Sequence, residues 1–65
     1  MKAEIRMTLD AGTGLWTATV MVDGNIKRIS EPRKWGVTLA DGLRSWCITQ
    51  GYDNLTVVWP RKEGA

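Results

Sequence analysis

The sequence predicts a small α+β fold, in which one helix packs on one face of an antiparallel sheet and the elements follow the order β-β-β-α-β. Residues 2–9 alternate apolar and polar side chains, which is typical of a strand with one buried face. From residue 38 the apolar residues instead recur at the spacing of an amphipathic helix. Turn-forming residues at 10–14 and 23–25 separate the first three segments.

The alternation assigns a face to most residues of the predicted strands, because successive side chains on a strand point to opposite faces. In strand 15–22, one face carries Trp16, Ala18, Val20 and Val22. A hairpin at 23–25 leads to strand 26–31, with either Asp23-Gly24 or Gly24-Asn25 as its two-residue loop. Both registers place Ile29 on the buried face and Ile26 on the open face. Pro32 should end this strand and Pro60 the last one, 54–59, because proline has no N–H for the ladder.

Thr38 is the expected N-cap of the helix and Gly51 the expected residue just past its end. Gly42, inside the helix, lowers helix stability by about 1 kcal/mol relative to alanine. Close packing of a Trp ring on this position would explain why a glycine is tolerated there. The predicted core contains Ile5, Met7, Leu9, Trp16, Ala18, Val20, Ile29, Leu39, Leu43, Trp46, Cys47, Leu55, Val57 and Trp59. The predicted open sheet face carries Glu4, Arg6, Thr17, Thr19, Met21, Ile26, Arg28, Thr56 and Val58.

The length of 65 residues is enough for one domain, here assigned to residues 1–60, with 61–65 as a polar C-terminal tail. A single cysteine, Cys47, cannot form an internal disulfide, which favours a reducing compartment. The alternating start is unlike a signal peptide, and no stretch is long enough to span a bilayer. We therefore expect a cytoplasmic protein with no membrane partner.

The composition argues against an enzyme. The chain has no histidine, which excludes a Ser-His-Asp triad, a Cys-His pair and imidazole metal ligands. Cys47 falls on the apolar stripe of the helix, where a small core residue is expected. The seven acidic residues are scattered, and three of them lie in predicted turns. We expect no catalytic residue, no metal and no cofactor.

Two surfaces could bind a partner. The basic residues Lys27, Arg28, Arg33 and Lys34 adjoin Trp35, a combination that suits phosphates and a stacked base. Trp35 could instead close the open edge of the small core. On the open sheet face, Met21, Ile26 and Arg28 form a mixed patch that suits a protein partner better.

Residues 15–60, "LWTATV … GVTLADGLRSWCITQGY … NLTVVWP", resemble the short podophage inhibitors of bacterial RNA polymerase in the order of their elements and in a few apolar positions. In that family, arginines on the closing strand contact the polymerase; the matching positions here are Val57 and Trp59. The helix start also resembles the "T-x-x-A-L" opening of HicB-type antitoxin domains, with Gly42 in place of their alanine.

The favoured function is a non-catalytic binding module, encoded by a phage or a bacterium, that regulates or inhibits a protein partner. The alternative is a nucleic-acid-binding protein that uses the basic 27–35 loop and Trp35. Salt dependence separates these two hypotheses, because phosphate contacts weaken steeply with ionic strength. A homodimer formed through an exposed strand edge is a third possibility.

Overall fold

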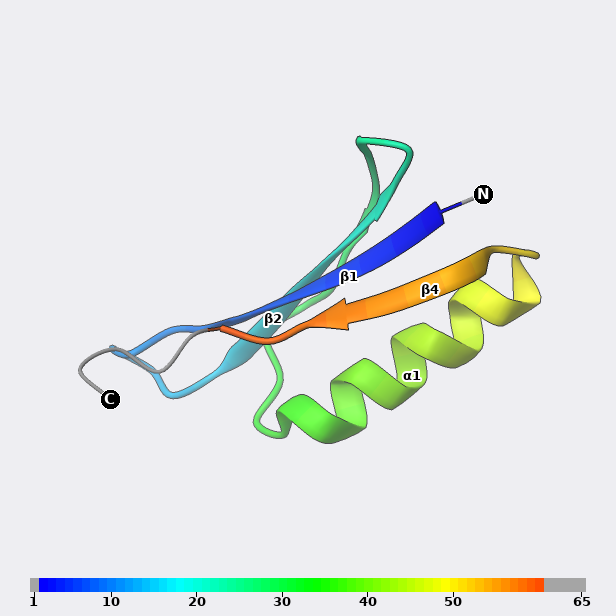
Figure 1. Cartoon of the computed structure of the whole chain (residues 1–65). Coiled ribbons are helices and arrows are strands. Elements are labelled where there is room, and N and C mark those ends of the chain that lie inside the picture. Colours follow the sequence, from blue (N-terminus) through cyan, green and yellow to red (C-terminus); the bar gives the residue numbers. More distant parts are fainter. Residues whose placement is uncertain (1, 61–65) are drawn as a thin grey trace.

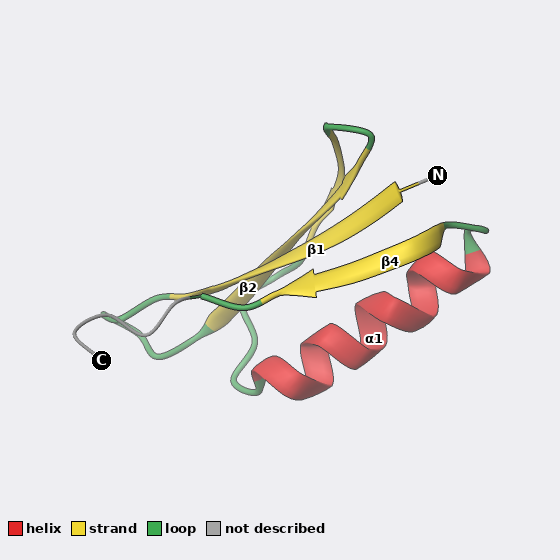
Figure 2. Cartoon of the chain, viewed as in Figure 1, coloured by secondary structure: helices red, strands yellow, loops and turns green. Residues whose placement is uncertain are grey.

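Four strands form one sheet, and a helix covers one of its faces in the computed structural model, which describes residues 2–60 (Figures 1 and 2). The elements are β1 (Lys2–Leu9), β2 (Trp16–Val22), β3 (Asn25–Ile29), α1 (Gly36–Thr49) and β4 (Asp53–Val58). The predicted α+β class and element order are confirmed. The predicted tail, 61–65, lies outside the described residues.

The sheet is mixed, with strand order β3-β2-β1-β4. β1 pairs with β2 in antiparallel fashion, as predicted, but it pairs with β4 in parallel, with Ile5 opposite Val57. The prediction of an antiparallel sheet was therefore wrong for β4. The reason is the helix: α1 carries the chain back along the sheet, so β4 starts at the same end as β3 and runs in the direction of β1.

The predicted faces of β1, β2 and β4 are confirmed. The side chains of Ala3, Ile5 and Met7 on β1 are buried, and so are those of Ala18, Val20 and Val22 on β2. Leu9, however, is 45% exposed and does not belong to the core. The pairing of β1 with β4 stops at Arg6, so no strand within residues 2–60 pairs with the end of β1 on that side.

β3 departs from the predicted facing because of a bulge. Asp23 and Gly24, both with positive φ, form the two-residue loop, so that Asn25 pairs with Val22 and Ile26 with Met21. Arg28 then pairs with Val20, which leaves Lys27 as an extra residue. One extra residue in a strand moves each side chain that follows it to the opposite face of the sheet.

The bulge overturns two predictions. Ile29, predicted to be buried, lies opposite Thr19 and is 65% exposed. Arg28, predicted on the open face, lies opposite Val20 on the helix side of the sheet. Ile26 precedes the bulge, and its predicted place on the open face is confirmed by its exposure of 59%.

The connector from β3 to α1 is anchored to β2. Backbone N–H groups of Ser30 and Arg33 donate to the carbonyls of Ala18 and Trp16 at 2.8 and 2.7 Å, respectively. The Ser30 hydroxyl accepts a hydrogen bond from the Ala18 N–H at 2.9 Å. Glu31 and Pro32 lie between these anchors, so the strand ends at Ile29 rather than at residue 31.

The start of α1 also differs from the prediction. The N-cap is Trp35, without a side-chain hydrogen bond, and the helix begins at Gly36 instead of after Thr38. Gly36 packs on the indole ring of Trp16, where an added Cβ would lie 2.8 Å from Cδ2. This close approach brings the first turn onto the sheet. At the other end, Gly51 has φ 83°, as expected for a residue that follows a helix.

The core is smaller than predicted. Its buried cluster consists of Ile5, Met7, Ala18, Val20, Ala40, Leu43 and Cys47. Trp16, Leu39, Trp46, Tyr52, Leu55 and Val57 pack against this cluster and are partly buried. Trp59 is 43% exposed and was wrongly placed in the core; it lies at the margin, edge-on to Trp16 with the ring centroids 5.6 Å apart. Gly42 has open space where a Cβ would stand, so no Trp ring packs on it.

Candidate binding groove between α1 and β3

The helix leaves one strand of the sheet uncovered. A helix with its side chains is about 10 Å wide, whereas neighbouring strands are about 4.8 Å apart, so one helix cannot cover four strands. Among the described elements, α1 lies against β1, β2 and β4. All five residues of β3, which lies at the edge of the sheet, are exposed. A groove remains beside α1, above β3.

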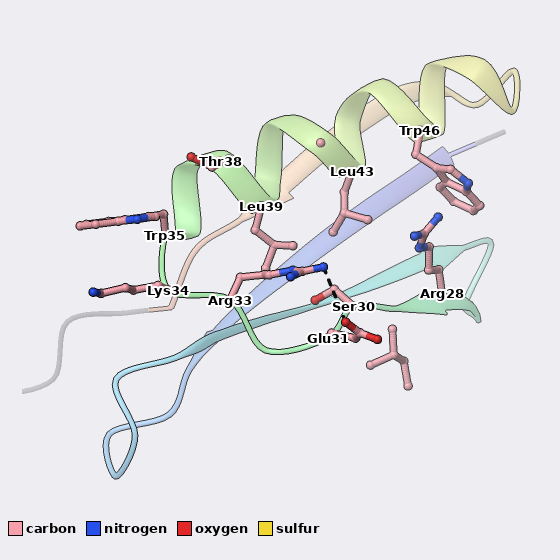
Figure 3. Close-up of a pocket in the computed structure, with 12 residues that line it drawn as sticks. Arg28, Ser30, Glu31, Arg33, Lys34, Trp35, Thr38, Leu39, Leu43 and Trp46 are labelled. Atoms are coloured by element: carbon pink, nitrogen blue, oxygen red, sulfur yellow. Dashed lines mark ion pairs between the residues drawn. The ribbon is translucent and has the colours of Figure 1, made fainter.

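We call this feature the α1–β3 groove; it has a volume of about 780 Å³ and is open to solvent (Figure 3). One wall is a stripe of α1, and the other is the end of β3 with the connector that follows it. Its lining consists of Arg28, Ile29, Ser30, Glu31, Arg33, Lys34, Trp35, Thr38, Leu39, Gly42, Leu43 and Trp46.

The middle of the groove is apolar. Leu39 and Leu43 point from α1 into it (Figure 3). Leu43 is buried and belongs to the core cluster, whereas Leu39 is only partly buried. Gly42 lies between them in the sequence and adds no side chain, so the helix surface has a notch there. An apolar side chain of a partner could pack on Leu39 and Leu43, and the notch at Gly42 would leave space for it.

Arg28 and Trp46 close one end of the groove. The guanidinium carbon of Arg28 lies 5.0 Å from the centroid of the Trp46 ring, within the range of a cation–π contact. Trp46 also contacts Tyr52, whose ring centroid is 6.0 Å away at an interplanar angle of 65°. The bulge at Lys27 makes this contact possible, because without it Arg28 would face away from the helix.

The connector supplies charged side chains along the middle of the groove and at its other end (Figure 3). Arg33 crosses toward the floor and forms an exposed ion pair with Glu31, with 3.6 Å between Nη2 and the carboxylate oxygen (Figure 3). The Nζ of Lys34 lies 5.8 Å from the centroid of Trp35. These two side chains extend side by side away from the helix. Trp35 is 68% exposed, so it does not close the core.

The structure brings together four of the seven predicted partner-binding residues. Arg28, Arg33, Lys34 and Trp35 all line the groove. Met21 and Ile26 lie on the opposite face of the sheet, and Lys27 occupies the bulge. The predicted set is therefore divided between two faces of the molecule.

Sequence reasoning missed the helical side of the groove. Leu39, Leu43 and Trp46 were assigned to the core alone, although Leu39 and Trp46 are only partly buried. One signal was available: the apolar stripe of the helix includes large side chains, whereas the predicted strand 26–31 offers only two isoleucines to cover them.

Within residues 2–60, no group of three or more His, Cys, Asp or Glu side chains could hold a metal ion. Cys47 is fully buried, and its burial raises the pKa of the thiol, which keeps it protonated at neutral pH. The same part of the chain has no helix with the length and apolar character needed to cross a bilayer.

Comparison of the chain with models of known families, with curated proteins and with solved structures finds no match.

Proposed function

We propose that the chain is a small non-catalytic module that regulates or inhibits a protein partner by occupying its surface. The α1–β3 groove carries this proposal, because it combines an apolar floor at Leu39 and Leu43 with a polar, largely cationic rim. Protein interfaces have this arrangement, in which an apolar centre excludes water and the rim supplies orientation. Arg and Trp side chains, both present at the groove, are enriched among residues that dominate binding energy.

The resemblance to podophage inhibitors makes bacterial RNA polymerase the first partner to test, and a phage or a bacterium the expected source of the chain. The contact would differ from that of the resembling family. Val57, at one of the two positions matching its arginines, is partly buried against the core, and Trp59, at the other, packs on Trp16. The groove offers cations instead. A protein acting on this enzyme would work in the cytoplasm, where a free Cys47 is stable.

The test is a titration of the N-terminally labelled chain with purified bacterial RNA polymerase, followed by fluorescence anisotropy and by the yield of a transcription assay. Saturable binding and a lower transcript yield are expected. Gly42→Gln should weaken both effects, because its side chain enters the groove, whereas Gly42→Ala should not. If the chain neither binds the polymerase nor lowers the yield, this enzyme is not its partner.

Trp35 favours a second candidate function, nucleic-acid binding. Its ring is largely exposed beside Lys34, with Arg33 next in the chain, and an exposed ring among cations can stack on an unpaired base. Binding to mixed single- and double-stranded oligonucleotides should then weaken steeply with salt and be lost in Trp35→Ala with the fold intact. Absence of binding at low salt would exclude this function.

A further inference from the structure

We infer that the occupant of the α1–β3 groove is an acidic peptide segment with apolar side chains at its centre. This inference rests on the proposed function and specifies the chemistry of the partner. Its basis is the arrangement of charges and hydrocarbon along the groove (Figure 3): Arg28 at one end, Lys34 at the other, and the apolar floor with Arg33 beside it between them.

The charge of the groove selects an anionic occupant. Its lining holds three cations, Arg28, Arg33 and Lys34, against one carboxylate, Glu31. The resulting net charge of +2 equals that of the whole chain, so the remaining charged residues balance one another. Glu31 neutralises little, because its ion pair with Arg33 is exposed on both sides. Acidic side chains of a partner would meet Arg28 at one end of the groove and Lys34 at the other.

The floor of the groove selects a peptide over a simple polyanion. A phosphate backbone gains nothing from Leu39 and Leu43, whereas apolar side chains gain about 25 cal/mol for each Å² removed from water. The notch at Gly42 gives such a side chain open space on the helix surface that lines the groove. Trp46, which contacts both Arg28 and Tyr52, ends the floor with an aromatic ring.

The length of the groove sets the size of the segment. The lining residues of α1 extend from Thr38 to Trp46, which corresponds to roughly 12 Å of helix axis at about 1.5 Å per residue. An extended peptide covers that distance with about four residues at roughly 3.3 Å each. A segment of seven residues, apolar in the middle and acidic at both ends, therefore spans the floor and reaches the cations.

The experiment uses the whole chain and three fluorescein-labelled probes. The first is the peptide Glu-Asp-Leu-Phe-Leu-Asp-Glu. In the second, Ser-Gly-Ser replaces the apolar centre, and the third is a single-stranded DNA 12-mer. Fluorescence anisotropy is measured at low and at physiological salt. The first probe should bind with a Kd of about 10–100 µM, and the second at least about tenfold more weakly, because it lacks the apolar centre.

Matched variants locate the binding site. Gly42→Gln should weaken binding of the first probe by about tenfold, because it fills the notch, whereas Gly42→Ala should change it less than about twofold. Removing the two cations of the connector, in Arg33→Gln with Lys34→Gln, should weaken binding by about threefold to tenfold. Arg44→Gln, an exposed helix position outside the groove lining, is the control. Circular dichroism establishes that each variant is folded.

The outcomes distinguish this inference from the function on which it rests. Equal binding of the first two peptides, or binding unaffected by Gly42→Gln, overturns the inference. Binding of the DNA 12-mer alone overturns both the inference and the protein-binding function. If no probe binds but the chain binds RNA polymerase, the inference fails and the proposed function stands.

Discussion

The Cα of Gly36 lies against the indole ring of Trp16, so close that a Cβ at this position would be 2.8 Å from Cδ2 and 2.9 Å from Cε2. The ring cannot withdraw freely, because Trp59 packs edge-on against it with the centroids 5.6 Å apart. This contact joins the first turn of α1 to the start of β2 and determines where the connector, with its cations, enters the groove.

Gly36→Ala should therefore destabilise the fold. Inserting a methyl group into this contact should lower the free energy of unfolding by about 1–2 kcal/mol, the usual cost of overpacking. The measurement is a urea titration followed by tryptophan fluorescence. An unchanged or higher urea midpoint would show that the Trp16 ring moves aside without lowering the stability of the fold.

Gly42→Ala should have the opposite effect. No heavy atom lies within 4 Å of the position a Cβ would take, so the added methyl group meets no obstacle. Alanine is better than glycine in a helix interior by about 0.8–1 kcal/mol. The same urea titration should show a gain of that size, and a loss would mean that the space beside Gly42 is occupied in solution.

Arg28 and Trp46 should be coupled. A cation over an aromatic face at an exposed site contributes about 0.5–1 kcal/mol, so Arg28→Gln should cost about that much in wild type. In a Trp46→Leu background the same substitution should cost almost nothing. Urea titrations of the four proteins give the coupling energy, and additive effects would mean that the two side chains do not interact.

Burial of Cys47 should make stability fall at alkaline pH. Burial raises the pKa of this thiol in the folded state, so the folded protein holds the proton more tightly than the unfolded chain. The stability that the protonated thiol contributes is fully present below the pKa of the unfolded thiol. It is lost as the pH rises above that value and through the higher pKa of the folded state.

The measurement compares unfolding free energies of wild type and Cys47→Ala from roughly pH 7 to 10.5, with the difference between the two proteins isolating the thiol. Wild type should lose stability relative to the variant on the alkaline side. A difference that stays constant with pH would contradict the assigned burial.

The two exposed isoleucines of β3 should contribute little to stability. Ile26 and Ile29 both lie on the open face, and replacing both with Thr should change the free energy of unfolding by less than about 0.5 kcal/mol. Val20→Ala, in the core beneath them, should cost about 2 kcal/mol.

The same pair of isoleucines tests the homodimer hypothesis. The thermal midpoint of wild type should not depend on protein concentration, because no association is needed to cover the core cluster. A midpoint that rises with concentration in wild type but not in the Thr double variant would identify the open face as an interface between two copies.

The sequence by itself determined the type and order of the elements and the faces of β1, β2 and β4. Alternation along residues 2–9 placed Ile5 and Met7 in the core correctly, and Gly51 correctly marked the end of the helix. These features are local. A period of two or of about 3.6 residues records which side chains share a face, and neighbouring residues are enough to read it.

Tertiary structure alone decided the facing of β3, the start of α1, the direction of β4 and the groove itself. The extra residue at Lys27 exchanged the faces of Arg28 and Ile29, although nothing in the local pattern of β3 marks a bulge. The helix began at Gly36 because a ring twenty residues earlier lies against it. Each of these features depends on residues far apart in the chain, and packing between distant segments leaves no period in the sequence that could reveal it.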